Sequence, residues 1–285
     1  MGGVFGRKRG PPPHIIAVNH ALVEQQKRAI AEAEQRARNA ADELTRLKAQ
    51  HEAEINRQVL ARGPVTEKAL IIEAQQQLGI DVDSDYNFLI TGDSGAGKSS
   101  TINAILRLNS NDPGAAAVGV TETTGELAKY FSPENLHVKL WDAPGAGTTR
   151  FPTFHPENPD LHYYRRFKLY AFDCVIIFYS GRLLDGAATL AQVCHKGRQP
   201  VAIVRNKADC MVDDLIENGV AKTEEEAKRM ARQAFEIELR EKLGDLAIPR
   251  FLVSIKRYKR NICEFDEIAL IEYIQQAAIP RSGAQ

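Results

Sequence analysis

The segment that most constrains how this chain folds is Gly92–Ser99, which reads Gly-Asp-Ser-Gly-Ala-Gly-Lys-Ser. It follows the apolar stretch Asn87–Ile90 and opens a predicted helix near Lys98. This is the strand–loop–helix context that the pattern G-x-x-x-x-G-K-[ST] requires. Backbone N–H groups of such a loop point at an anion, and the helix N-terminus adds partial positive charge. The sequence therefore predicts a phosphate-binding loop.

Two side chains of the loop have expected roles. Lys98 is expected to bridge the β- and γ-phosphates, and the Ser99 hydroxyl to ligate Mg²⁺, which prefers oxygen ligands. The residues predicted to surround the phosphates are Gly92, Asp93, Ser94, Gly95, Ala96, Gly97, Lys98, Ser99 and Ser100.

Short apolar stretches alternate with amphipathic helices after Asp81. Strands are predicted at Tyr86–Thr91, Glu126–Phe131, Leu136–Trp141, Cys174–Tyr179, Pro200–Arg205 and Arg250–Ser254, and helices at Lys98–Leu108, Asp160–Tyr170, Gly186–His195, Thr223–Leu243 and Glu264–Ala277. This order predicts an α/β fold with a mostly parallel sheet covered on both faces. Ligands of such sheets bind beyond the carboxyl ends of the strands.

A second candidate motif, Asp142-Ala143-Pro144-Gly145, ends the predicted strand Leu136–Trp141. A carboxylate at such a strand end holds the magnesium ion in P-loop enzymes, so Asp142 is the predicted metal residue. The N–H of Gly145 is placed to sense the γ-phosphate. The alternative is an ordinary turn of Asp, Pro and Gly.

The stretch Gly119–Thr124 lies between these motifs. A threonine here would complete the magnesium coordination when a triphosphate is bound and release it after hydrolysis. Thr124 is the predicted ligand, with Thr123 as the second choice; the alternative is a solvated polar loop.

A third motif, Asn206-Lys207-Ala208-Asp209, follows the predicted strand Pro200–Arg205. The Asp209 carboxylate can accept hydrogen bonds from N1–H and the exocyclic amine of guanine, a donor pair that adenine lacks on that edge. Asn206 would join neighbouring loops, and the Lys207 stem would cover one face of the base. A last contact to guanine is expected from Ser254, Ile255 and Lys256, with a simple strand-end turn as an equal alternative.

With these motifs in order, the chain resembles a Ras-like GTPase, a P-loop NTPase G domain. More narrowly it resembles the immunity-related (interferon-inducible) GTPases, from about Ala69 to Ala277, on the stretches GDSGAGKSS, GVTETT, WDAPGAGTTRFP and FDCVIIFY. The resemblance implies GTP or GDP and Mg²⁺ as ligands. Family members carry a helical domain on both sides of the G domain, whereas this chain ends at Gln285, so a member without the C-terminal helical domain is expected.

Ala146 follows Gly145, where many small GTPases carry a Gln that orients the attacking water. We therefore expect slow GTP hydrolysis by the monomer. In the family that the chain resembles, two G domains meet across their nucleotides and a switch-region Glu takes part in activation. Glu122 occupies the matching position, which predicts a homodimer with Glu122 as a contributor; a solvated loop carboxylate is the alternative.

The region before the G domain divides into a flexible basic arm at 1–14 and a long helix or helical hairpin at 15–63, with the GTPase domain at 64–285. Apolar residues follow a loose heptad at Ile16, Val23, Ile30, Ala37 and Leu44. This pattern fits a coiled coil, and equally one or two helices that lie on the main domain. A further helix is predicted at Val65–Leu78, ending at Gly79.

The start of the arm, Met1–Gly6, nearly matches the myristoylation pattern, except that Gly6 stands where Ser or Thr is preferred. Arg7, Lys8 and Arg9 follow at once, and an acyl chain with a basic cluster would hold a membrane surface. A disordered Gly-rich start is the alternative. The balance of 37 Lys and Arg against 37 Asp and Glu excludes bulk nucleic-acid binding, and we expect a cytoplasmic, or peripherally membrane-bound, protein.

Overall fold

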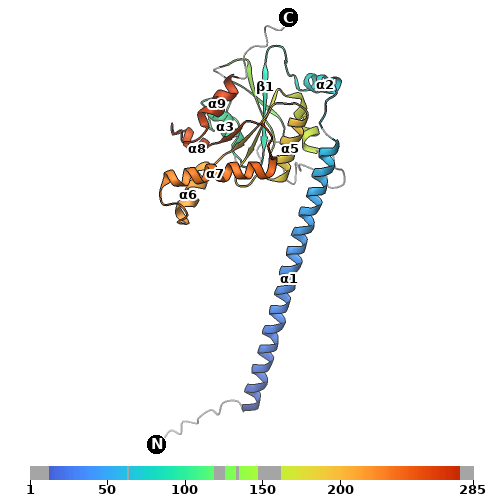
Figure 1. The fold of residues 1–285 in the computed structure, drawn as a ribbon, viewed down its shortest axis with the longest axis vertical. Coiled ribbons are helices and arrows are strands. Elements are labelled where there is room, and N and C mark those ends of the chain that lie inside the picture. Colours follow the sequence, from blue (N-terminus) through green and yellow to red (C-terminus); the bar gives the residue numbers. More distant parts are fainter. Residues whose placement is uncertain (1–12, 63, 119–125, 133–134, 147–161, 277–285) are drawn as a thin grey trace, which may run out of the picture. The chain divides into compact units, whose positions relative to one another are not determined.

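A computed structural model describes residues 13–276, apart from 63, 119–125, 133–134 and 147–161; in the first helix it describes the side chains at 27–28, 30–51, 53–54 and 57. Its centre is a six-stranded sheet in the order β2-β3-β1-β4-β5-β6 (Figure 1). The strands are β1 Tyr86–Gly92, β2 Ala128–Phe131, β3 Val138–Asp142, β4 Cys174–Tyr179, β5 Val201–Arg205 and β6 Arg250–Leu252. All neighbours are parallel except the edge strand β2, which runs antiparallel to β3.

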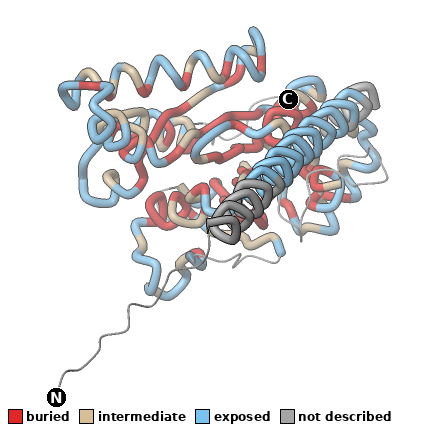
Figure 2. Tube along the Cα trace, turned by 90° about the horizontal axis from the view of Figure 1, so that it is seen from below, coloured by how far each residue is buried: buried red, intermediate tan, exposed pale blue. Residues whose placement is uncertain are grey.

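The central strands β1, β4 and β5 are largely apolar on both faces because successive side chains point to opposite sides of a sheet and both sides are covered here. In β1, Leu89 packs into one core, whereas Phe88 and Ile90 pack into the other. The same alternation holds in β4, where Val175 and Ile177 join Leu89. This explains why these strands read as continuous apolar runs, and Figure 2 shows them mostly buried.

Helices cover the two faces as distinct groups (Figure 1). One face packs against α3 Lys98–Ile105 and α9 Glu267–Gln276, with the short α8 Ile255–Tyr258 beside them. The other face packs against α2 Lys68–Leu78, α4 His162–Arg166, α5 Asp185–Lys196 and α7 Glu224–Leu243. The predicted α/β fold, a G domain with a mostly parallel sheet, is confirmed by this arrangement.

Three local features differ from the sequence-based expectation. The helix expected at Asp160–Tyr170 is instead α4 followed by the 3-10 turn η1 Leu169–Ala171, because Lys168 between them adopts a left-handed conformation with φ 49°. Helix α6 Ala208–Glu217, which begins inside the Asn206–Asp209 motif, was not expected from the sequence. The same holds for α8, a single turn after β6.

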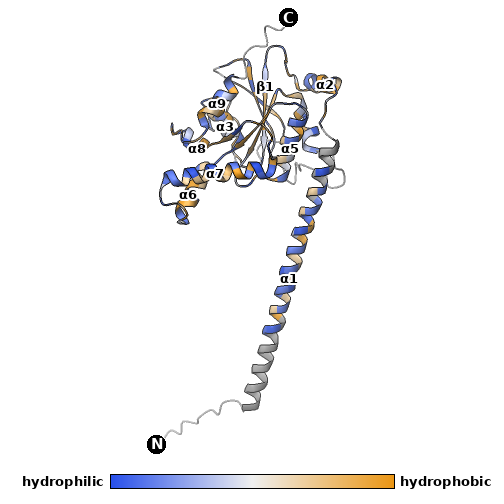
Figure 3. Cartoon of the chain, in the orientation of Figure 1, coloured by the Kyte–Doolittle hydropathy of each residue, from blue (hydrophilic) through white to orange (hydrophobic). Residues whose placement is uncertain are grey.

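The N-terminal region forms one continuous helix, α1 Pro13–Arg62, and not a hairpin. Its described side chains are all exposed, including Ile30, Leu44 and Leu47. Figure 3 shows scattered hydrophobic residues along a mostly hydrophilic helix. Contacts divide the chain into two units, Met1–Ala53 and Glu54–Gln285. The boundary between them lies ten residues before the one that the sequence predicted at residue 63. Residues 1–12 of the arm, with its basic cluster, lie outside the described residues, and the coiled coil stays a prediction.

Candidate nucleotide site

The phosphate loop connects the end of β1 to the start of α3, as its pattern requires. Gly97 caps α3 with φ 92°, and a Cβ at this position would lie 2.2 Å from Nδ2 of Asn206. Glycine is therefore required here both by the backbone conformation and by the close approach of another loop. The loop residues run in order from the buried end of β1 to the first turn of α3: Gly92 and Ala96 are buried, Asp93, Gly97, Ser99 and Ser100 are partly buried, and Ser94 and Gly95 are exposed.

The Lys98 ammonium folds back over the loop. It donates hydrogen bonds to the carbonyl oxygens of Gly92 at 3.0 Å and Asp93 at 2.8 Å, and the residue is only 7% exposed. An ammonium held this way by backbone carbonyls places a positive charge at the loop. The arrangement suits an anionic ligand.

Burial raises the pKa of the Asp93 carboxyl from 3.8 to about 6, while the charge of Lys98 opposes the rise. Burial at this position of the loop therefore disfavours the ionised form of the Asp93 carboxyl. Asp93 is also the point at which the next motif meets the loop, through a parallel β-bridge to Ala146.

The two predicted magnesium ligands in the described part of the chain lie together. The Ser99 hydroxyl donates a hydrogen bond of 2.6 Å to Oδ2 of Asp142, a carboxylate that is 1% exposed at the end of β3. Hydroxyl and carboxylate oxygens are the donors that Mg²⁺ prefers, so this pair fits the ion. No group of three or more His, Cys, Asp or Glu side chains able to hold a metal occurs among the described residues.

The residues after Asp142 pack directly on the phosphate loop. The N–H of Ala146 donates to the carbonyl of Gly92 at 2.9 Å. A Cβ on Gly145 would come within 2.9 Å of the Cα of Ser94, so this position also needs glycine. Gly145 is thus placed against the loop that is predicted to hold the phosphates.

The base-reading motif follows β5 and meets the phosphate loop. The Asn206 amide donates to the carbonyl of Ala96 at 3.0 Å, and its oxygen accepts from the N–H groups of Lys207 and Ile255. Asp209 lies in the first turn of α6 and is 5% exposed, whereas Lys207 is exposed and left-handed with φ 64°. Asn206 therefore joins three loops.

The loop after β6 is held by a residue that sequence reasoning missed. Glu267, 0% exposed in the first turn of α9, accepts from the N–H of Ser254 at 2.7 Å. Its other oxygen accepts from the N–H groups of Glu264 at 3.2 Å and Phe265 at 2.9 Å. The signal in the sequence is weak, because an acidic residue near a helix start is common. In this loop Ser254 and Ile255 are buried and Lys256 is exposed.

Glu122, Thr123 and Thr124 lie outside the described residues, as does the stretch 147–161 that contains most of the family-like segment after Gly145.

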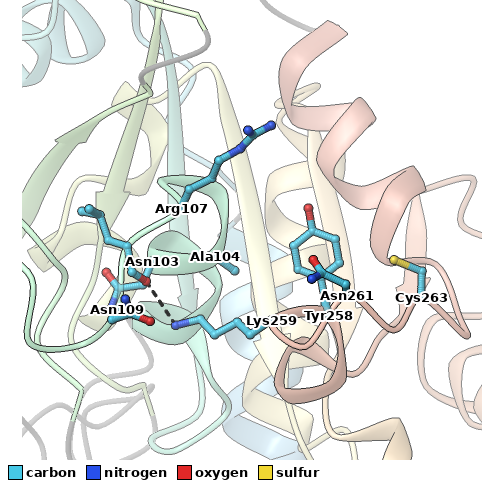
Figure 4. A pocket seen from close by; sticks show the side chains of 9 residues that line it. Asn103, Ala104, Arg107, Asn109, Tyr258, Lys259, Asn261 and Cys263 are labelled. Atoms are coloured by element: carbon cyan, nitrogen blue, oxygen red, sulfur yellow. Dashed lines mark hydrogen bonds between the residues drawn. The ribbon is translucent and has the colours of Figure 1, made fainter.

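A separate pocket of about 560 Å³ lies between the C-terminal end of α3 and the α8 region (Figure 4). Its lining includes Arg107, Asn109, Lys259 and Asn261, and the Lys259 ammonium donates to the carbonyl of Leu108 at 3.5 Å. The phosphate loop leads into the opposite end of α3. This pocket is therefore not the phosphate site.

The sheet order, the phosphate loop after β1, the carboxylate at the end of β3 and the Asn-Lys-Ala-Asp motif after β5 together define a P-loop NTPase of the G-domain class. The model of the interferon-inducible GTPase family matches residues 53–277. The chain belongs to this family.

The chain is 37% identical over 123 residues to interferon-gamma-inducible GTPase 10 of Mus musculus, covering 43% of this chain and 28% of that protein. It is 30% identical over 196 residues to interferon-inducible GTPase 1 of Mus musculus, covering 67% and 44%. The chain thus matches less than half the length of these relatives. Among solved structures, Toc33 from Arabidopsis thaliana in complex with GDP and Mg²⁺ has a TM-score of 0.46 and 14% identity, with 78% of this chain and 95% of that one covered.

Within the described residues, no helix combines the length and the apolar character needed to span a membrane.

Proposed function

We propose that this chain binds GTP and hydrolyses it to GDP and phosphate as a Mg²⁺-dependent switch. The observation that carries the proposal is the convergence of three motifs. Ser99 of the phosphate loop contacts Asp142, and Asn206 contacts Ala96 of the same loop. Membership of the interferon-inducible GTPase family supports the same activity.

The loop and its cation would bind the phosphates. Lys98 would exchange its carbonyl contacts in part for the β- and γ-phosphate oxygens, which carry more negative charge. Ser99, Asp142 and Thr124 would hold Mg²⁺, which when bound neutralises charge on the β- and γ-phosphates. The Gly145 N–H would donate to the γ-phosphate.

Guanine would be selected at the other end of the site. Asp209 would accept from N1–H and the exocyclic amine, and Lys207 would cover one face of the base. The loop of Ser254, Ile255 and Lys256 would supply the last contact. The Ser254 hydroxyl is buried and has no hydrogen-bond partner in the described part of the chain, which favours a ligand contact there.

Ala146 would not orient the attacking water, because its side chain has no polar atom and is 7% exposed. We propose that a second copy of the chain completes the site, with Glu122 contributing across a G-domain dimer. Hydrolysis would then be slow in the monomer and faster in the dimer.

The test is phosphate release measured at several protein concentrations with saturating GTP and Mg²⁺. The proposal expects the rate per molecule to rise with protein concentration, and Glu122→Ala to flatten that rise while GTP binding is kept. Lys98→Ala is the control that abolishes turnover at every concentration. A rate per molecule that does not depend on concentration would count against dimer activation.

A second candidate is a nucleotide-gated scaffold that binds GTP or GDP with very low turnover, and Ala146 favours it. The same assay separates the two. Tight binding of GDP and GTP, with negligible release of phosphate at every protein concentration, would identify the scaffold.

The protein is further proposed to be cytoplasmic and, through the N-terminal arm, to bind membrane surfaces, with no nucleic-acid partner. Mass spectrometry of the native N-terminus would show whether Gly2 carries an acyl chain. Co-sedimentation with anionic vesicles, for the native protein and Gly2→Ala, would then measure its contribution. Equal sedimentation of both would remove the acyl anchor from the proposal.

A further inference from the structure

A buried chain of two hydrogen bonds connects β1, α4 and the turn after β3. The hydroxyl of Thr91 donates to the hydroxyl of Tyr163 at 2.8 Å, and the Tyr163 hydroxyl donates to the carbonyl of Pro144. Thr91 and Tyr163 are each 0% exposed. Linked donors of this kind polarise one another, and in a dry environment each bond is costly to lose.

The position of this chain relative to the site is specific. Thr91 directly precedes Gly92, the first residue of the phosphate loop, and Pro144 directly precedes Gly145. The Tyr163 ring is fixed by the core, with its centroid 4.8 Å from that of Phe167. One rigid side chain therefore bonds to the strand that carries the phosphate loop and to the turn that packs on it.

The Pro144 carbonyl and the Gly145 N–H belong to a single peptide unit. That unit is planar, and the described residues contain no cis peptide bond. In a trans peptide the C=O and N–H bonds point in opposite directions. Because Tyr163 holds the Pro144 carbonyl toward the core, it also fixes the Gly145 N–H in the direction away from Tyr163.

We propose that Tyr163 is a positioning residue that orients the Gly145 N–H for the γ-phosphate, and so sets the preference of the site for a triphosphate over a diphosphate. The inference rests on the proposed function. Without the Tyr163 hydroxyl, the Pro144–Gly145 peptide can rotate, and binding of a γ-phosphate must then also order this peptide. A diphosphate has no γ-phosphate, so its binding does not require this peptide to be ordered.

The test uses the full chain with Mg²⁺ and fluorescent analogues of GDP and of a non-hydrolysable GTP. Tyr163→Phe keeps the ring and removes only the hydroxyl. We expect the affinity for the GTP analogue to fall about five- to tenfold relative to that for GDP, the effect of losing one buried hydrogen bond. A purely structural role of Tyr163 would lower the affinities for GDP and for the GTP analogue by the same factor.

Tyr164→Phe is the matched control. Tyr164 is the neighbouring residue of α4, is 3% exposed, and packs with its ring centroid 5.7 Å from that of Tyr170. Its substitution is expected to leave the GTP-to-GDP affinity ratio unchanged. Thr91→Val removes the other donor but keeps the Tyr163–Pro144 bond, so we expect a smaller shift of the GTP-to-GDP affinity ratio in the same direction. This variant provides the test if Tyr163→Phe does not fold.

An unchanged ratio in both Tyr163→Phe and Thr91→Val, or an equal change in Tyr164→Phe, would overturn the inference and leave the proposed function intact. Absence of guanine-nucleotide binding by the native chain would overturn both.

Discussion

The side-chain amide of Asn206 donates a hydrogen bond to the carbonyl of Ala96 at 3.0 Å, across 110 positions of the sequence. The same side chain accepts from the N–H of Ile255, in the loop after β6. One buried residue therefore ties the phosphate loop to both loops that are proposed to contact the base.

Replacing Asn206 should weaken nucleotide binding. Asn206→Ala leaves a carbonyl and two N–H groups without their partner, and each such buried group costs about 1–3 kcal/mol. We expect the affinity for GDP to fall about 10–100-fold, measured by fluorescence titration. Asn218→Ala is the control, because Asn218 is exposed at the end of α6 and its amide donates to the carbonyl of Asp214, four residues earlier. Equal GDP affinity in the native protein and Asn206→Ala would contradict this role.

Ser99→Ala should remove the response to magnesium. The variant loses one of the two proposed oxygen ligands in the described part of the chain, and it keeps the loop backbone and Lys98. In the native protein we expect GDP to bind more tightly in Mg²⁺ than in EDTA, and in Ser99→Ala we expect that gain to shrink about tenfold or more. Affinities in EDTA should be similar for both proteins, which provides the internal control. An undiminished magnesium effect in the variant would exclude Ser99 as a ligand.

Glu267→Gln should destabilise the domain. The Glu267 carboxylate accepts from three backbone N–H groups in a fully buried position, and an amide in its place directs two hydrogens at donors. Bonds to charged groups contribute about 1.5–3 kcal/mol each, so we expect a loss of about 2–3 kcal/mol in the free energy of unfolding, measured in urea. Glu272→Gln, at an exposed position of the same helix, should change it by less than about 0.5 kcal/mol. A comparable effect of the two substitutions would show that burial of the carboxylate is unimportant.

Asp93 should make stability depend on pH. Its pKa is raised by burial from 3.8 to about 6, so between these values the folded state keeps a proton that the unfolded state releases. The contribution of Asp93 to stability is therefore present below pH 3.8 and is lost as the pH rises through about 6. Asp93→Asn removes the titrating group, and its free energy of unfolding should decline less across this window. Parallel profiles for the two proteins would contradict the assignment.

Residues 92–99, 142–145 and 206–209 could be identified from the sequence because each motif is local and lies at the end of an apolar strand. The central strands β1, β4 and β5 could be predicted because burial on both faces makes them short apolar runs. Helix α6 was missed because its sequence overlaps the Asn206–Asp209 motif, and the break at Lys168 because a left-handed residue other than glycine leaves little trace in composition.

The sequence by itself determined the class of fold, the phosphate loop and the identity of the residues that face the nucleotide in the proposed function. Only the tertiary structure decided which of these residues support one another. The bond from Asn206 to Ala96, the three N–H groups on Glu267 and the Tyr163 hydroxyl between Thr91 and Pro144 all join separate segments of the chain. Their geometry depends on how strands and helices pack around the sheet, and a pattern of neighbouring residues carries no record of distances between segments that meet only when the core has formed.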